Sequence, residues 1–141
     1  MQKIQSILYD AARIVAALIL LQTLYFKFTG SSESVYIFTT VGVEPWGRIM
    51  AGVLELVAAI LLLVRVSAWL GSILALGMMA GALGMHLTLL GIEVQGDGGY
   101  LFFLAVLVAV CSAFVLVKNK AKIMALIQNL KAVKKDIARS R

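Results

Sequence analysis

Two ionisable residues lie inside long apolar segments of this 141-residue chain. Glu55 is in the segment 48–64, and His86, the single histidine, is in the segment 67–92. An ionisable group in hydrocarbon is unfavourable unless it is paired, protonated or hydrated, so each of the two marks a candidate site. A carboxyl group and an imidazole can supply and accept a proton. We therefore treat Glu55 and His86 as a candidate catalytic pair of proton donor and acceptor.

Three further charged residues are expected near this pair. At 1.5 Å per residue, Glu55 lies about 10 Å from the start of its segment and His86 about 9 Å from the end of its segment. These two ends are expected on the same, outer side of the membrane, and Lys27, Arg48 and Glu93 fall in the same half. Arg48 and Glu55 are seven residues apart and share a helix face. If the faces converge, these five residues line a polar pocket that binds a ligand. Alternatively, they hydrogen-bond one another and fix the helix register, or extend separately to the membrane surface.

Metal and redox centres are only weakly indicated. His86, Glu93 and Asp97 could approach one another, but one histidine and two loop carboxylates are not the ligand set of a typical zinc site. Cys111 is the single cysteine, which excludes an intramolecular disulfide and a CxxC motif. We expect Cys111 to pack as a small side chain, and we predict no metal site and no intrinsic cofactor.

The composition indicates an integral membrane protein. Hydrophobic residues make up 62% of the chain and charged residues 14%, and the mean hydropathy is +0.98. Soluble domains have about 45–50% apolar and about 25% charged residues. A soluble globule and a disordered chain are therefore excluded. The net charge of +6 could suggest nucleic-acid binding, but the excess charge lies at one end of the chain and cannot form a basic groove.

Four segments are long enough to span a bilayer. A spanning helix needs about 20 apolar residues, and the candidates are 8–28, 48–64, 67–92 and 100–117. We predict an all-α, polytopic four-transmembrane-helix bundle over 1–117, followed by a tail over 118–141. No A-x-A-like cleavage site follows the first span, so we expect it to be a helix of the mature protein.

The charges outside the spans predict the orientation. With the N-terminus inside, the inner side carries eleven Lys and Arg residues and the outer side only Lys27 and Arg48. Positive charges accumulate on the cytoplasmic side, so both termini are expected there. In a bacterium, this corresponds to the cytoplasmic (inner) membrane.

Two segments outside the spans have amphipathic patterns. Residues 34–41 are too apolar for a free loop, and we expect a short interfacial segment that lies on the membrane or folds over the bundle as a lid. In 118–141, eight cations flank a stripe of apolar residues with spacings of three and four. This pattern predicts a basic amphipathic helix on anionic lipid; a short coiled coil with a partner or a second subunit is the alternative.

Small and polar residues in the spans predict helix contacts. Gly77 and Gly81 form a GxxxG pair, which allows close helix approach, and the small surface continues in Gly71, Ala75, Ala80 and Gly84. The third span is therefore expected to be the central packing helix. Gln22 is expected to form an interhelical hydrogen bond, Thr23 lies beside Lys27, and Arg13 and Arg65 are expected to be anchors at the inner side.

Short motifs in this order and spacing resemble the DoxX-like family of small four-helix membrane proteins, over about residues 8–117. The matching motifs are FKFTG at 26–30, ESVYIF at 33–38, GVLEL at 52–56, MAGA at 79–82, HL at 86–87, and DGG at 97–99 with LF at 101–102. One relative, DoxD, is a membrane subunit of thiosulfate:quinone oxidoreductase, and others are associated with oxidative-stress complexes. Distant relatives are a cargo receptor and a receptor-assembly chaperone.

The resemblance implies a function in quinone chemistry. By analogy, Lys27, Glu55 and His86 would contact a quinone head group, with His86 hydrogen-bonded to a quinone oxygen and Glu55 exchanging the proton. The chain departs from redox enzymes in lacking a cysteine pair, paired histidines for haem and a nucleotide-binding glycine motif. It would therefore be at most a subunit of an oxidoreductase.

Three functions follow as hypotheses. The first is a membrane subunit that binds a quinone-like or other small amphipathic molecule and supports a partner oxidoreductase. The second is a small-solute or proton-coupled transporter, which would need a homo-oligomer because four spans enclose only a narrow path. The third is a non-catalytic assembly factor or anchor that recruits a partner through the tail.

Overall fold

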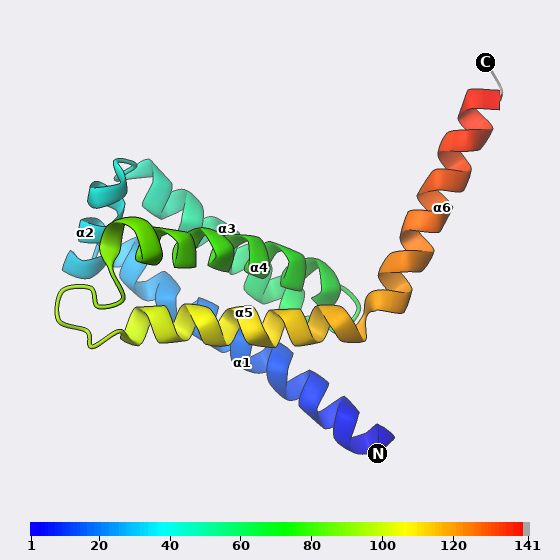
Figure 1. Cartoon of the computed structure of the whole chain (residues 1–141), viewed down its shortest axis with the longest axis horizontal. Helices are drawn as coiled ribbons and strands as arrows, with labels where there is room; N and C mark the ends of the chain where they lie inside the picture. The colour runs from blue at the N-terminus through cyan, green and yellow to red at the C-terminus, as the bar shows by residue number, and fades with distance from the viewer. Residues whose placement is uncertain (140–141) are drawn as a thin grey trace.

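The computed structural model describes residues 1–139 as a set of helices without strands (Figure 1). Ser140 and Arg141, the last residues of the predicted tail, lie outside the described residues. The helices are α1 (Gln2–Thr29), α2 (Ser32–Val41), α3 (Trp46–Leu63), α4 (Ala68–Met85), α5 (Tyr100–Lys118) and α6 (Lys120–Arg139), and α4 continues directly as the π-helical turn η1 (His86–Leu90).

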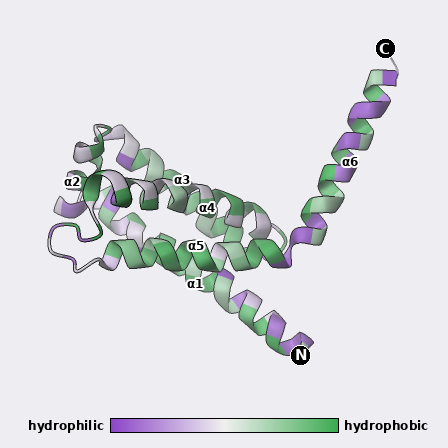
Figure 2. Ribbon diagram, in the orientation of Figure 1, coloured by the Kyte–Doolittle hydropathy of each residue, from purple (hydrophilic) through white to green (hydrophobic). Residues whose placement is uncertain are grey.

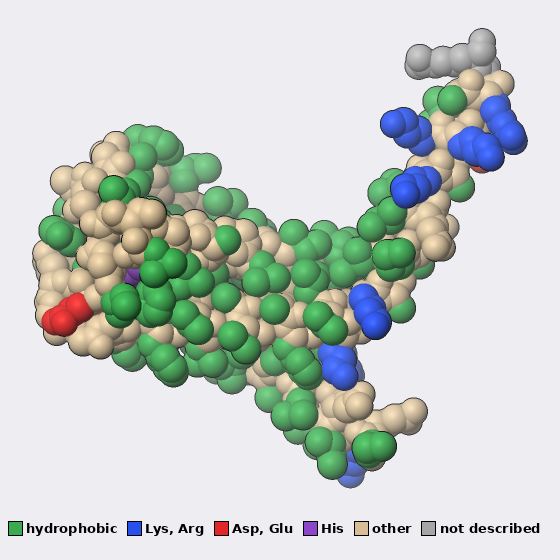
Figure 3. All heavy atoms as spheres, viewed as in Figure 1, with side chains coloured by type: hydrophobic (Ala, Val, Ile, Leu, Met, Phe, Trp, Pro, Cys, Tyr) green, Lys and Arg blue, Asp and Glu red, His purple; other side chains and the backbone are tan. Residues whose placement is uncertain are grey.

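Four of these helices are long and apolar enough to cross a membrane: α1, α3, α4 with η1, and α5. The predicted all-α membrane bundle is confirmed, and its helices contact the lipid bilayer. The side of the bundle seen in Figure 3 is largely hydrophobic, whereas Lys and Arg side chains gather on α6 and near the start of α1 (Figures 2 and 3). The first helix begins six residues before the predicted 8–28, at Gln2, because the apolar run marks only the part that lies in hydrocarbon.

The four spans form a ring in which α1 and α4 each pack against both α3 and α5. We call the end of the bundle that carries α2 the lid end, and the end where α6 leaves it the tail end. Between these ends the core is rich in alanine, with Ala16, Ala17, Ala58 and Ala59 fully buried. Small side chains let neighbouring helix backbones approach closely, which is how helices gain packing energy in lipid.

The small residues of α4 do not all pack as predicted. At Gly71 an added Cβ would lie 2.7 Å from the backbone nitrogen of Leu62, so α4 touches α3 there. At Gly77, Gly81 and Gly84 it would meet no atom within 4 Å. The predicted GxxxG packing face is therefore wrong, because close approach occurs at the tail-end half of α4 while its other half borders open space.

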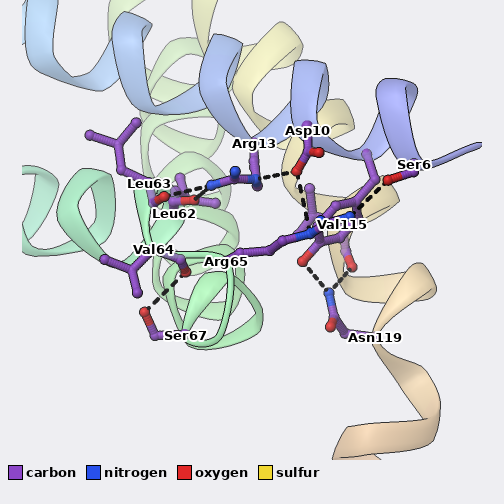
Figure 4. Close-up of polar contacts among 11 residues, drawn as sticks. Ser6, Asp10, Arg13, Leu62, Leu63, Val64, Arg65, Ser67, Val115 and Asn119 are labelled. Carbon is purple, nitrogen blue, oxygen red and sulfur yellow. Dashed lines mark hydrogen bonds and ion pairs between the residues drawn. The ribbon is translucent and has the colours of Figure 1, made fainter.

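Two arginines join the antiparallel helices α1 and α3 reciprocally. At the tail end, the Nη1 of Arg13 donates to the carbonyl oxygens of Leu62 at 3.1 Å and Leu63 at 2.6 Å (Figure 4). At the lid end, the Nη1 of Arg48 donates to the carbonyl of Lys27. The last carbonyls of a helix lack intrahelical partners and carry partial negative charge. Each arginine therefore caps the C-terminus of the other helix.

The segment after α1 folds over the bundle. Ser31 caps α2 by accepting a hydrogen bond from the backbone nitrogen of Ser34 at 3.3 Å, as Ser does at helix N-termini. Helix α2 contacts α1, α3 and η1 and buries Ser34 and Phe38. Of the two predicted arrangements for this segment, the lid is the one observed.

Helix α6 leaves the bundle at Asn119, which separates it from α5 (Figure 1). None of its described residues is buried. Its apolar stripe, which includes Leu126, Leu130 and Val133, is exposed. The tail is therefore a helix with an apolar face that the bundle does not cover.

Candidate functional site

A cavity of about 440 Å³ lies in the lid-end half of the bundle. Residues of α1, α2, α3, α4, η1 and α5 line it, and most of its wall is apolar, with Leu54, Met78, Met79 and Leu104 among the lining side chains. Helix α2 covers the lid end through Phe38. An apolar cavity with a few polar groups in its wall is typical of a small-molecule site.

The Lys27–Glu55 ion pair lies in the wall of this cavity. The Nζ of Lys27 on α1 is 2.9 Å from the Oε2 of Glu55 on α3, and the two side chains are 16% and 6% exposed. The hydroxyl of Thr23 lies 3.0 Å from the same carboxylate oxygen and 2.8 Å from the carbonyl of Leu20. Glu55 therefore shares one oxygen between a cation and a hydroxyl, and it ties α1 to α3.

Both members of the pair keep capacity for a ligand. The Oε1 of Glu55 has no hydrogen-bond partner among residues 1–139, and Glu55 lines the cavity. A lysine ammonium carries three donors, and in the described chain only the contact with Glu55 occupies the ammonium of Lys27. The cavity wall thus presents a hydrogen-bond acceptor next to a donor.

His86 lines the same cavity from the start of η1, the continuation of α4. It is 5% exposed, and only a small part of it is visible between neighbouring side chains in Figure 3. Its Nδ1 lies 2.8 Å from the carbonyl oxygen of Gly91, and its ring packs edge-to-face on Phe102 at 5.6 Å between centroids. A carbonyl only accepts, so Nδ1 carries the proton and the Nε2 of a neutral His86 is an acceptor.

The five predicted pocket residues divide into two groups. Lys27, Glu55 and His86 line the cavity. Arg48 does not; its guanidinium binds the Glu44 carboxylate, with Nη2 at 2.7 Å from Oε1, and caps α1. Glu93 is exposed in the loop after η1 and does not line the cavity. Glu55 and His86 face the same cavity but do not hydrogen-bond each other. Of the five residues, only Lys27 and Glu55 contact one another in the way that the alternative to a ligand pocket requires.

Two features of the site have no signature in the sequence: the hydrogen-bond partner of His86 and the position of Ser34 in the cavity wall. The carbonyl of Gly91 reaches His86 only because α4 ends in a π-helical turn and the chain then reverses. Ser34 lines the cavity because α2 folds inward. The predicted interhelical hydrogen bond of Gln22 is confirmed, since its Nε2 donates to the Tyr100 hydroxyl at 3.3 Å.

Asp97 organises the loop beside His86. Its Oδ1 accepts from the backbone nitrogens of Val94 at 2.9 Å and Gly99 at 2.8 Å, and its Oδ2 accepts from that of Leu101 at 2.9 Å. Burial by itself raises the pKa of the Asp97 carboxyl, but the three backbone N–H donors bring that pKa below its usual value. Asp97 is thus committed to the loop, and residues 1–139 contain no cluster of three His, Cys, Asp or Glu side chains fit to hold a metal ion.

Comparison with models of known protein families identifies the family of the chain. A family model, DoxX, matches residues 8–88, which is more than half of the sequence. The chain belongs to the DoxX family. The match runs from α1 to η1 and so contains Lys27, Glu55 and His86. No curated protein and no solved structure matches this DoxX family protein.

Proposed function

We propose that this DoxX family protein is a membrane subunit that binds a small amphipathic molecule of the quinol and quinone type in the lid-end cavity and serves a partner oxidoreductase. One observation carries the proposal: the Lys27–Glu55 ion pair and His86 lie together in the wall of an otherwise apolar cavity. An apolar ring and tail fit the cavity, and polar oxygens fit the three side chains.

The hydrogen-bonding capacities favour a ligand that has both hydroxyl and carbonyl character. The Nε2 of a neutral His86 and the Oε1 of Glu55 accept, so each fits a quinol hydroxyl. The ammonium of Lys27 donates, so it fits a carbonyl oxygen. His86 and Glu55 are the groups that take the ligand protons, and electron transfer is assigned to the partner oxidoreductase.

The closed end of the cavity favours binding over transport. Toward the tail end, the core residues Ala16, Ala59 and Leu62 are fully buried and do not line the cavity. A transport path would need an opening through this layer.

Two leucine substitutions on α4 test the cavity. Gly81 and Gly84 both border open space, but only Gly81 lines the cavity. We expect Gly81→Leu to abolish binding of a short-chain quinol to the purified protein in neutral detergent, measured by calorimetry, and Gly84→Leu to retain it. Glu55→Gln and His86→Ala should also abolish binding while the protein stays folded and inserted. Unchanged affinity in Gly81→Leu, Glu55→Gln and His86→Ala would refute the proposal.

The orientation and location are proposed on the charge distribution. The tail end carries most of the cations, so we place it and both termini in the cytoplasm, in a bacterial cytoplasmic membrane. The exposed basic helix α6 would then lie on anionic lipid of the inner leaflet. Cysteines introduced at Lys131 and Glu93 in a Cys111→Ala background should react with a membrane-impermeant reagent from opposite sides of the membrane.

A further inference from the structure

A second pocket lies at the tail end, where the start of α1, the α3–α4 turn and the α5–α6 junction meet. Three cations line it: Arg65 from the turn, Lys118 from the end of α5 and Lys122 from the start of α6. Figure 4 shows the extended side chain of Arg65 reaching across to Ser6 and Asp10 on α1. The pocket is thus built from three parts of the chain that are far apart in sequence.

The positive charge of this pocket is not balanced by carboxylates. Asp10 is the nearby acid, and its Oδ1 lies 2.8 Å from the Nε of Arg13 but 3.5 Å from that of Arg65. One carboxylate shared between Arg13 and Arg65 leaves the three cations of the pocket with excess positive charge. Among residues 1–139, no carboxylate lies within salt-bridge distance of Lys118 or Lys122. The ammonium of Lys118 is held by a neutral partner, the Oε1 of Gln5, at 3.2 Å.

Neutral side chains complete a set of hydrogen-bond donors. The Ser6 hydroxyl accepts from the Nη2 of Arg65 at 2.8 Å, and the Tyr9 hydroxyl accepts from the Nδ2 of Asn119 at 2.9 Å. A hydroxyl has one proton as well as its lone pairs, so each of these oxygens still has a proton to donate. Cations and hydroxyl donors around one open pocket match a group that carries negative charge and only accepts hydrogen bonds, which is the chemistry of a phosphate.

We propose that this tail-end pocket is a binding site for the phosphate of an anionic phospholipid headgroup. The four spans begin or end beside it, so the pocket lies at the level of the lipid phosphates. Val66 lines it and is 77% exposed, which offers apolar surface next to the cations. Basic pockets between transmembrane helices bind anionic headgroups in this way. The site is independent of the lid-end cavity and of any ligand there.

Two double variants remove the same charge at different places. Lys118→Gln with Lys122→Gln removes two cations of the pocket, whereas Lys131→Gln with Lys134→Gln removes two cations further along α6, outside the pocket. All four side chains are surface residues, and their replacement leaves the bundle core intact. Binding of phosphatidylglycerol to the full chain in neutral detergent is measured by native mass spectrometry, with phosphatidylcholine as the neutral control lipid.

We expect the pocket variant to weaken phosphatidylglycerol binding about thirtyfold, the equivalent of about 1 kcal/mol per cation, and the α6 variant to change it less than about threefold. Equal losses in both variants would show a diffuse attraction to α6 and overturn the site. Equal binding of phosphatidylcholine would overturn its charge selectivity. Inorganic phosphate alone is the second arm: saturable binding as tight as that of the lipid would assign the pocket to the free ion and overturn the lipid proposal.

Discussion

Removal of both members of the Lys27–Glu55 pair should destabilise the bundle less than the sum of the two single removals. Lys27→Met leaves the carboxyl of Glu55, 6% exposed, without its cation. Removing one partner of a buried ion pair costs about 3–5 kcal/mol, whereas replacing both partners is often neutral. Because both side chains are well buried, solvent screening reduces this cost little.

The two single variants should differ from each other. Glu55→Gln keeps an amide oxygen that accepts from Lys27, and Lys27 remains in the last turn of α1, where a cation interacts favourably with the helix terminus. We expect a loss of about 1–3 kcal/mol for Glu55→Gln, less than for Lys27→Met. The double variant Lys27→Met with Glu55→Gln should cost less than the sum of the two single losses, by about 1–3 kcal/mol.

The measurement is equilibrium unfolding in mixed micelles with rising dodecyl sulfate, followed by the fluorescence of Trp46 and Trp69. Lys131→Met is the matched control, because Lys131 lies on exposed α6, and it should stay within about 0.5 kcal/mol of the parent protein. Additive losses in the double variant, or a Lys27→Met variant as stable as the control, would refute the interpretation that the pair ties α1 to α3.

Three other predictions concern close packing, the loop after η1 and helix capping. Gly71→Ala should cost about 1–3 kcal/mol, since its Cβ would press on the backbone of Leu62, whereas Gly84→Ala, in open space, should not destabilise in the same unfolding assay. Because the pKa of Asp97 is lowered in the folded protein, its ionised carboxylate stabilises the fold. This stabilisation is fully present above the pKa of about 3.9 in the unfolded chain, and it is lost as the pH falls through the lower pKa of the folded protein. Hydrogen-exchange protection of its amide donors should therefore fall in that acidic range, and in Asp97→Asn it should be low at neutral pH as well. Arg13→Gln should cost about 1–3 kcal/mol, because it leaves the last carbonyls of α3 without their charged donor; a loss no larger than that of an exposed-charge control would contradict the capping role.

The helices were predictable because bilayer thickness requires long apolar segments. The spans 48–64 and 100–117 differ from α3 and α5 by at most two residues at each end. Helix starts in water are less constrained, and α1 begins before the apolar span, at Gln2. The packing face of α4 was also not predictable, because Gly71 and Gly81 are both small residues of one apolar helix. Only the tertiary structure shows that Gly71 packs on α3 while Gly81 borders open space.

The candidate site was predictable in part, for an energetic reason. Ionisable residues in hydrocarbon need partners, so Glu55, His86 and Lys27 could be selected by depth and by helix face. Arg48 met the same criteria, yet it serves as a cap because Glu44, four residues earlier, and the end of α1 both lie within its reach. The partner of His86 is a backbone carbonyl, and side-chain patterns contain no information on where a carbonyl will point.

The different charge balance at the two ends of the bundle argues for different ligands. At the lid end, Lys27 and Arg48 each have a carboxylate partner, Glu55 and Glu44 respectively. An anionic ligand in the lid-end cavity would have to displace Glu55 from Lys27 or lie beside its negative charge, and both are costly where water is scarce. At the tail end, Lys118 and Lys122 have no carboxylate within salt-bridge distance in the described chain, so an anion gains their attraction without such competition. The same physical rule thus favours a neutral amphipathic molecule in the cavity and an anionic headgroup at the tail end.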